Sequence, residues 1–385
     1  MSVRLPSMMT QFQELIALPS ISSPFAELDQ SNRRVIELLA TWLGDRGFAC
    51  EILEVPGNPG KFNLIATLGS GPDGLVLAGH TDTVPFDDGL WQYDPFRVTE
   101  ADGKLYGLGV ADMKGFFPLV LEAIKDLRAE DLKAPVIVLA TADEETSMEG
   151  ARSLVNAGKP RARYAIVGEP TNLKPVRTHK GILMEAVRIR GQSGHSSNPA
   201  LGRNALDAMH SAIAELIRFR EELKQRATNP AFAVAEPTLN LGYIHGGDNV
   251  NRICGNCELH FDLRPLPGMS CAALQAEVKE RLAPVEARHG VSLVVESLYP
   301  AVEGMETPAD SELVKAAERL TGFAAESAAY TTEAGFLQQL GMDPIVLGPG
   351  DIAVAHQPDE HLLLDRLNPT VQLLKALLGR FCLKA

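Results

Sequence analysis

The sequence predicts an α/β protein, in which a mixed and mostly parallel sheet is flanked by helices and a smaller α+β domain is inserted. Short apolar runs alternate with helical periods over residues 1–180 and again over residues 296–385, which is typical of a sheet covered on both faces. Residues 181–295 differ, because their strands alternate apolar and polar residues. We therefore expect one discontinuous domain, 1–180 and 296–385, interrupted by a second domain at 181–295.

In the first domain, a helix running from about Ser31 to Asp45 carries its apolar residues on one face. Ser31 can cap its start, and Gly47 follows its end. Strands are expected next at residues 49–55, 62–68, 75–78, 135–140 and 164–167. Helical periods at residues 114–127 and 149–155 separate the last three strands. This order favours a parallel or mixed sheet.

The inserted domain has the order β-α-β-β-α-β, a ferredoxin-like pattern. Its expected elements are a strand at 182–190, a helix at 204–226, strands at 238–244 and 252–263, a helix at 272–288 and a strand at 291–295. The first domain then continues with helices at 312–320 and 333–340, a strand at 344–347 and an amphipathic helix at 366–381. One face of the inserted sheet needs a cover, which favours packing against a second subunit.

The composition narrows the classes of function. Of 385 residues, 45% are hydrophobic and 22% are charged, as in an ordinary globular protein. The excess of acidic residues gives a formal net charge of −13, which argues against a nucleic-acid partner. The five cysteines are few and scattered, and the N-terminal stretch lacks the apolar segment of a secretory signal. No apolar run approaches the roughly 20 residues of a membrane span, so we expect a cytoplasmic protein.

The stretch GSGPDG at residues 69–74 matches the dinucleotide-binding pattern G-x-G-x-x-G. That pattern needs a helix directly after it, because the pyrophosphate binds at the N-terminus of the helix. Here the apolar run LVLAG follows, so a turn between two strands explains the glycines better. A nicotinamide oxidoreductase is therefore disfavoured.

Five short polar clusters lie at the ends of apolar elements, namely His80 with Asp82, Asp112, the run Asp143–Glu145, Glu169, and His356. In open α/β sheets, ligands bind outside the carboxyl ends of the strands, where three of these clusters are expected. Histidines and carboxylates without cysteine suit divalent ions such as zinc, cobalt or manganese. Each cluster taken singly is more often a turn, a cap or a solvated pair, but together they favour a metal site.

The neighbouring carboxylates of Glu144 and Glu145 repel each other, at a cost of about 1 kcal/mol or more in a dry site. A cation beside them reverses the sign of this effect. One of the two can then bind a metal ion while the other stays free as a base. Asp112 is the candidate for a carboxylate shared by two ions, because it lies on a turn that can aim a short side chain.

Six stretches over essentially the whole chain resemble, in the same order, the motifs of the dinuclear zinc amidohydrolase family. They are GHTDTVPF, YGLGVADMKGF, ATADEETSMEGA, VGEPT, GQSGHSSNP and GPGDIAVAHQPDE. The family includes acetylornithine deacetylase, succinyl-diaminopimelate desuccinylase, aminoacylase and several zinc exopeptidases. The resemblance implies a zinc exopeptidase-like catalytic domain with two divalent ions, zinc with cobalt as a substitute. It also implies that the inserted domain is a lid or dimerisation domain of a homodimer.

For the metal ions, the resemblance implies two ligand sets that share one residue. His80, Asp112 and Glu169 would hold one ion, and Asp112, Glu145 and His356 would hold the other. Glutamate at position 169 is typical of the deacylase and desuccinylase members of the family.

For the chemistry, the resemblance implies that Glu144 is the general base and that Asp82 orients the ring of His80. His195, in GQSGHSSNP, would reach a substrate carbonyl from the partner subunit. Asn251 and Arg264 resemble contacts to the substrate carboxylate. Glu333, in YTTEAGF, is our candidate for a contact with the substrate ammonium.

The implied reaction is hydrolysis of N2-acetyl-L-ornithine to L-ornithine and acetate by a metal-activated water, a step of arginine biosynthesis. Two alternatives stay open. One is a related deacylase or peptidase of the same family, and the other is a non-catalytic protein that binds metal or amino acids.

Overall fold

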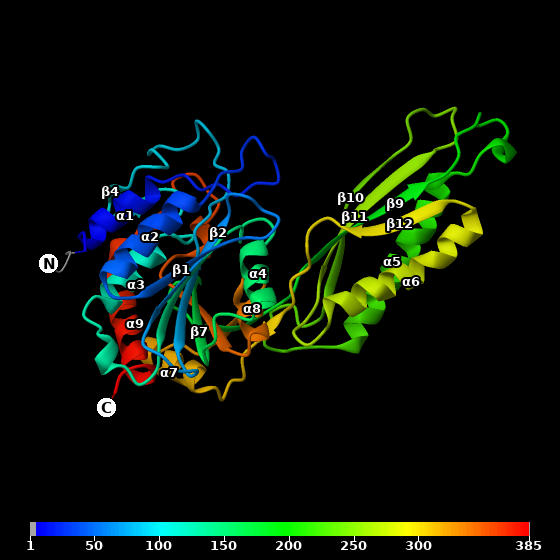
Figure 1. Cartoon of the computed structure of the whole chain (residues 1–385). Coiled ribbons are helices and arrows are strands. Elements are labelled where there is room, and N and C mark those ends of the chain that lie inside the picture. The colour runs from blue at the N-terminus through cyan, green and yellow to red at the C-terminus, as the bar shows by residue number, and fades with distance from the viewer. Residues whose placement is uncertain (1–4, 385) are drawn as a thin grey trace. The chain divides into compact units, whose positions relative to one another are not determined.

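A computed structural model of the chain describes residues 5–384, which form two compact units (Figure 1). Unit 1 comprises the chain up to Arg177, Thr307–Glu326 and the chain from Thr332. Unit 2 comprises Thr178–Glu306 and Ser327–Thr331. The sequence placed the divisions at residues 180 and 296. Unit 2 extends to Glu306 because Met305 and Glu306 pair with His179 and Thr178. The roles assigned to the two domains stay predictions.

The sheet of unit 1 has four parallel strands at its centre, which run in the order β6-β3-β7-β15. Their bounds are Val136–Thr141 for β6, Leu75–His80 for β3, Tyr164–Pro170 for β7 and Asp343–Gly348 for β15. Almost every residue of these strands is buried, as expected for parallel strands covered on both faces. This arrangement confirms the predicted α/β class.

Shorter and antiparallel strands extend the sheet on both sides. On one side lie β2 (Phe62–Leu68) and β1 (Ala49–Glu54). On the other side lies β8 (Val176–His179), whose last two residues belong to unit 2 and pair there with β13 (Met305–Glu306). Strand β14 (Glu326–Ala328) also pairs with β8. A separate three-stranded sheet contains β4 (Thr99–Ala101), β5 (Lys104–Tyr106) and β16 (His361–Leu363). The sequence did not predict this small sheet, because three-residue strands carry too little periodicity to detect.

Within residues 5–384, seven α-helices of unit 1 cover its main sheet. They are α1 (Met8–Ile16), α2 (Arg33–Asp45), α3 (Phe116–Ile124), α4 (Glu149–Ala157), α7 (Glu312–Thr321), α8 (Ala334–Gln339) and α9 (Leu367–Phe381). In Figure 1, α4 and α8 lie on the opposite side of the sheet from α1, α2 and α3. The larger core lies on the α1–α3 side, where α9 also packs on α3. The amphipathic helix expected at residues 366–381 is thus present as α9 and packs on this domain.

The parallel register brings the ends of three strands together. His80, the last residue of β3, lies opposite Thr141, the last residue of β6. On the other side of β3, Ala78 pairs with Val167, which sets His80 level with Glu169 of β7. Ligands of α/β sheets bind at the carboxyl ends of the parallel strands. The strand register therefore places His80 and Glu169 side by side where a ligand site is expected.

Unit 2 has a four-stranded antiparallel sheet in the order β10-β11-β9-β12. The strands are β9 (Leu183–Arg190), β10 (Thr238–Gly246), β11 (Asn256–Arg264) and β12 (Ser292–Ser297). Helices α5 (Ala205–Arg226) and α6 (Cys271–His289) pack on the sheet (Figure 1) and close a second core. Side chains of Asn204 and Ser270 cap the starts of the two helices.

His179 is a fully buried histidine of unit 2, and its environment makes stability depend on pH. Burial lowers the pKa of His179 from 6.5 to about 4, although its ring nitrogen contacts the Lys180 carbonyl at 2.9 Å. Between these pH values the unfolded chain binds a proton that the folded chain does not. Stability should therefore fall as the pH falls from 6.5 towards 4, by about 3 kcal/mol in all.

His179→Gln should remove this part of the pH dependence. The measurement is the free energy of unfolding in urea between pH 7 and pH 4.5, with His210→Gln at an exposed histidine as the control. Equal slopes for the wild type and His179→Gln would contradict the prediction.

No helix in residues 5–384 combines the length and the apolar character needed to cross a membrane.

Candidate metal centre

A cluster of carboxylates and imidazoles lies at the carboxyl ends of the central strands. His80 ends β3 and Glu169 belongs to β7, and both are buried. Glu144 and Glu145 come from the turn after β6, and Asp112 comes from the loop before α3. Hydrophobic strands thus hold these polar groups at one edge of the sheet.

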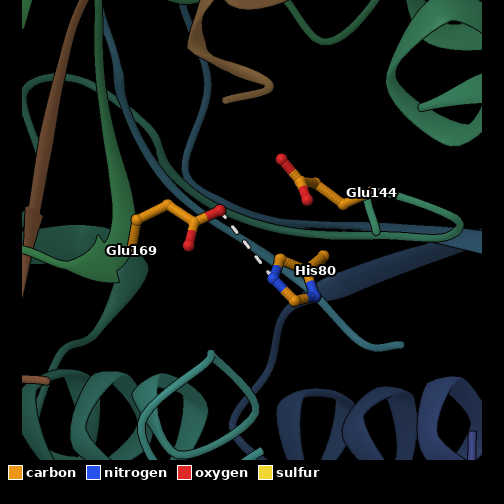
Figure 2. Close-up of side chains that lie close together, drawn as sticks. All are labelled: His80, Glu144 and Glu169. Carbon is orange, nitrogen blue, oxygen red and sulfur yellow. Dashed lines mark ion pairs between the residues drawn. The ribbon is translucent and has the colours of Figure 1, made fainter. Parts of the chain in front are cut away.

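The first group of side chains is built around His80. Its Nε2 lies 3.1 Å from Oδ1 of Asp112 and 3.8 Å from Oε1 of Glu169. Figure 2 shows that the carboxylates of Glu169 and Glu144 both lie beside this ring. Ligand atoms of His80, Glu144 and Glu169 lie within 4.8 Å of one another, close enough to hold a single metal ion.

The second group is built around His356, which is half exposed. Its Nε2 lies 3.3 Å from Oδ2 of Asp112 and 3.0 Å from Oε1 of Glu145. Asp112 therefore offers a different carboxylate oxygen to each histidine, as a carboxylate that bridges two ions must do. The structure thus brings together all five residues that the sequence proposed as ligands.

The pKa shifts of these side chains indicate that negative charge is concentrated in the cluster. Burial raises the pKa of Glu144 and of Glu169 well above the usual value, and the charge of Asp112 adds to the effect. Burial would also raise the pKa of Asp112, but its hydrogen bonds with His356 and His80 hold it below the usual value. Hydrogen bonds to Asp112 and Glu145 raise the pKa of His356 to about 10.

This donor set fits divalent cations. Two imidazoles face five carboxylates of the described residues, namely Asp82, Asp112, Glu144, Glu145 and Glu169. Packing so many carboxylates together is unfavourable unless cations compensate their charge. Oxygen and imidazole nitrogen ligands without sulfur suit zinc and similar ions.

Comparison with known proteins places the chain in a family. Residues 76–380 match the family described as peptidase family M20/M25/M40. The chain belongs to this family. Among curated relatives, the acetylornithine deacetylase of Proteus mirabilis (strain HI4320) is 52% identical over 383 residues, covering 100% of this chain and 99% of the relative. The acetylornithine deacetylase of Photorhabdus laumondii is 50% identical, with the same coverage.

Solved structures of the M20 family share the fold at much lower identity. A metallo-carboxypeptidase from Sulfolobus solfataricus is 19% identical with a TM-score of 0.74, and the match covers 98% of this chain and 99% of the other. A dinuclear metal binding peptidase from Bacillus subtilis is 15% identical with a TM-score of 0.66, covering 97% and 98%. The cluster of His80 and His356 therefore lies in a fold whose relatives include a protein with two metal ions.

Asp82 contacts both His80 and the turn that carries Glu144 and Glu145. Nδ1 of His80 lies 3.0 Å from the main-chain oxygen of Asp82 and 3.7 Å from its carboxylate. The carboxylate oxygens accept hydrogen bonds from the backbone amides of Glu144 at 3.3 Å and Glu145 at 3.1 Å. The sequence predicted the orientation of His80 by Asp82 but missed its hold on the two glutamates.

Glu360 is a buried residue of the site that sequence reasoning missed. Its carboxylate accepts hydrogen bonds from the amides of Gly109, Ala111 and Asp112, at 3.0, 2.8 and 3.0 Å. These contacts connect the loop of Asp112 to the segment that carries His356. The stretch HQPDE contains Glu360, but nothing in its pattern distinguishes a buried carboxylate from an exposed one.

The remaining predicted residues do not belong to the His80 and His356 groups. Glu333 is 1% exposed, and its Oε2 accepts a hydrogen bond from Thr141 at 2.6 Å. Burial raises the pKa of Glu333 to about 7. These facts favour a role in holding the end of β6. The contact between Glu333 and the substrate ammonium stays a prediction.

His195, Asn251 and Arg264 belong to unit 2. The segments of His195 and Asn251 are adjacent, because the amide of Ser196 donates to the Asn251 carbonyl at 3.0 Å. Nε of Arg264 lies 2.9 Å from Oδ2 of Asp262.

Proposed function

We propose that the protein is a metal-dependent amidohydrolase that converts N2-acetyl-L-ornithine and water into L-ornithine and acetate. The observation that carries the proposal is the position of Asp112, which reaches both histidines through separate oxygens beside Glu144. The choice of substrate is supported by curated relatives at 50–52% identity over the full chain. The reaction would belong to arginine biosynthesis, in the cytoplasm.

The proposed ligands form two sets. His80, Asp112 and Glu169 would hold one ion, and Asp112, Glu145 and His356 would hold the other, with zinc as the proposed metal and cobalt as a substitute. When bound, such a pair lowers the pKa of a water molecule towards ~7 and polarises the substrate carbonyl. Asp82 would keep the ring of His80 oriented.

Glu144 would be the general base. Its carboxylate lies in the His80 group, and burial raises its pKa well above the usual value, which makes it more basic than an exposed glutamate. Glu144 would take a proton from the attacking water and return it to the leaving nitrogen of ornithine. The hydrogen bonds from its own amide and that of Glu145 to Asp82 would hold it in place.

Unit 2 would supply substrate contacts in a homodimer. We assign Arg264 and Asn251 to the substrate carboxylate, and His195 of one subunit to the carbonyl of a substrate bound in the other. The imidazole of His195 lies on an exposed segment, where its Nδ1 contacts the Ser197 hydroxyl at 2.8 Å. This position leaves its other ring nitrogen free to donate to a developing oxyanion.

Substitution of His195 tests the shared site. His195→Ala should lower kcat without loss of metal, because His195 is not in either ligand set. Mixing His195→Ala subunits with Glu144→Ala subunits should restore part of the activity, since one site of each mixed dimer then has both residues. If no mixture is more active than the two variants measured separately, the shared site in a dimer is contradicted.

A substrate panel tests the function. The panel contains N2-acetyl-L-ornithine, N-succinyl-diaminopimelate, other N-acyl amino acids and dipeptides, each with added zinc or cobalt. We expect the highest kcat/KM for N2-acetyl-L-ornithine and loss of activity with a chelator. A higher value for a succinylated substrate or a dipeptide would assign the protein to another activity of the M20 family. No hydrolysis of any compound would favour a binding protein.

A further inference from the structure

Asp143 precedes the two glutamates of the metal cluster, and neither ligand set uses it. Its side chain is buried, and its backbone has a φ of 57°, a left-handed conformation that is unfavourable for most residues. Such a conformation persists only where the surrounding contacts hold it. The contacts that hold Asp143 are therefore informative.

The carboxylate of Asp143 is bound by Lys61 and Ser22. Its Oδ1 lies 2.9 Å from Nζ of Lys61 and accepts a hydrogen bond from the Ser22 hydroxyl, also at 2.9 Å. Lys61 is only 5% exposed, and it also contacts Oδ1 of Asp29 at 2.7 Å and the carbonyl of Gln30 at 2.8 Å. A buried ammonium with two carboxylates and a carbonyl is fully partnered.

The same network continues into the turn that carries Glu144. The carbonyl of Asp143 accepts a hydrogen bond from the amide of Met148 at 2.6 Å. The hydroxyls of Ser22 and Thr146 are 2.7 Å apart, which adds a second attachment. Residues 143–148 are thus held on one side through Asp143, while Asp82 holds the amides of Glu144 and Glu145.

We propose that Lys61 is a positioning residue for the general base, acting through Asp143 on the turn that carries Glu144. The inference rests on the proposed role of Glu144. Lys61 does not touch the metal cluster itself, since its contacts are with Asp29, Gln30 and Asp143. A displacement of about 1 Å of a catalytic group is enough to lower turnover roughly 100-fold.

Lys61→Met keeps most of the length of the side chain and removes its charge and its donors. With saturating zinc, we expect kcat to fall roughly 10–100-fold while KM stays within about twofold of the wild type. Bound metal should remain at the wild-type stoichiometry. Lys61→Arg, which keeps a cation and several donors, should recover part of kcat. The control is Lys174→Met, which removes an exposed ion pair with Glu326 and should leave kcat unchanged.

A double-mutant cycle tests the pathway through Asp143. If Lys61 acts on Glu144 through Asp143, then Asp143→Asn combined with Lys61→Met should lower kcat little more than the worse single variant. Additive effects, a wild-type kcat in Lys61→Met, or a fall in kcat matched by loss of metal would each overturn the proposal. Should Lys61→Met not fold, Ser22→Ala removes a smaller part of the same network and should show the same kcat-selective loss.

Different results would contradict the proposed substrate and the proposed role of Lys61. If the wild type does not hydrolyse N2-acetyl-L-ornithine but cleaves another compound of the panel, the proposed substrate is wrong. The variants of Lys61 can then be assayed with that compound, and the loss of kcat still decides whether Lys61 positions Glu144.

Discussion

Replacing Glu144 with alanine is expected to lower kcat by roughly 10²–10⁴-fold while both metal ions stay bound. The reason is that neither proposed ligand set uses Glu144. Asp82 is the other carboxylate outside both sets, and it accepts hydrogen bonds from the amides of Glu144 and Glu145. Without it, no side chain at that position takes the proton of the attacking water or returns one to the leaving nitrogen. The ligands His80, Asp112, Glu145, Glu169 and His356 are unchanged, so metal affinity should be nearly that of the wild type.

The geometry also allows a competing role for Glu144, because its carboxylate could join His80 and Glu169 around one ion. Metal analysis after dialysis separates the two roles. As a general base, Glu144→Ala keeps its metal and loses turnover, whereas as a ligand it loses both. Glu149→Ala, on the nearby helix α4, is the control for an acidic residue outside the cluster. Near-wild-type turnover in Glu144→Ala would refute its assignment as the base.

Much of the fold follows from local sequence pattern. The apolar runs at β3, β6 and β7 predicted these strands closely, because a strand buried on both faces contains almost only apolar residues. The long helices α5 and α6 were predicted within a few residues, since each has a capping residue before it and a periodic apolar face.

Other elements depend on tertiary contacts that local pattern does not contain. Helix α1 was not predicted, although its apolar residues Phe12, Leu15 and Ile16 pack in the main core. Helix α3 is shorter than its apolar pattern suggested, because Asp112 and Lys114 belong to a loop that buried hydrogen bonds hold in place. Such loops are fixed by partners that are distant in the chain.

The same distinction applies to the site. The proposed ligands His80, Glu145 and Glu169 follow apolar strands, so the sequence predicted that they converge at one edge of a parallel sheet. Apart from Asp82, the groups that hold the ligands were not predictable. The carboxylate of Glu360 accepts hydrogen bonds from three backbone amides of the Asp112 loop, and Lys61 binds Asp143. In the sequence, however, this glutamate and this lysine look like ordinary surface residues. Their function is visible only once their burial and partners are known.

Replacing Asp112 with asparagine should have the largest effect of all, because Asp112 belongs to both ligand sets. Asparagine keeps the size of the side chain, but it has no charge and only one oxygen. The amide nitrogen that replaces the second oxygen cannot bind a cation, so the bridge between the His80 and His356 groups is lost. Each ion contributes several kcal/mol to transition-state stabilisation, so kcat should fall roughly 10³-fold or more.

Metal content distinguishes this variant from substitutions at ligands of a single ion. Asp112→Asn should lose both ions on dialysis, whereas His356→Ala should lose one and keep the ion of the His80 group. The distances support this difference, since Oδ1 of Asp112 is 3.1 Å from His80 and Oδ2 is 3.3 Å from His356. Circular dichroism should show that the variant remains folded, because the Asp112 amide still donates to Glu360. If Asp112→Asn kept two tightly bound ions, the two groups would be separate sites rather than one bridged centre.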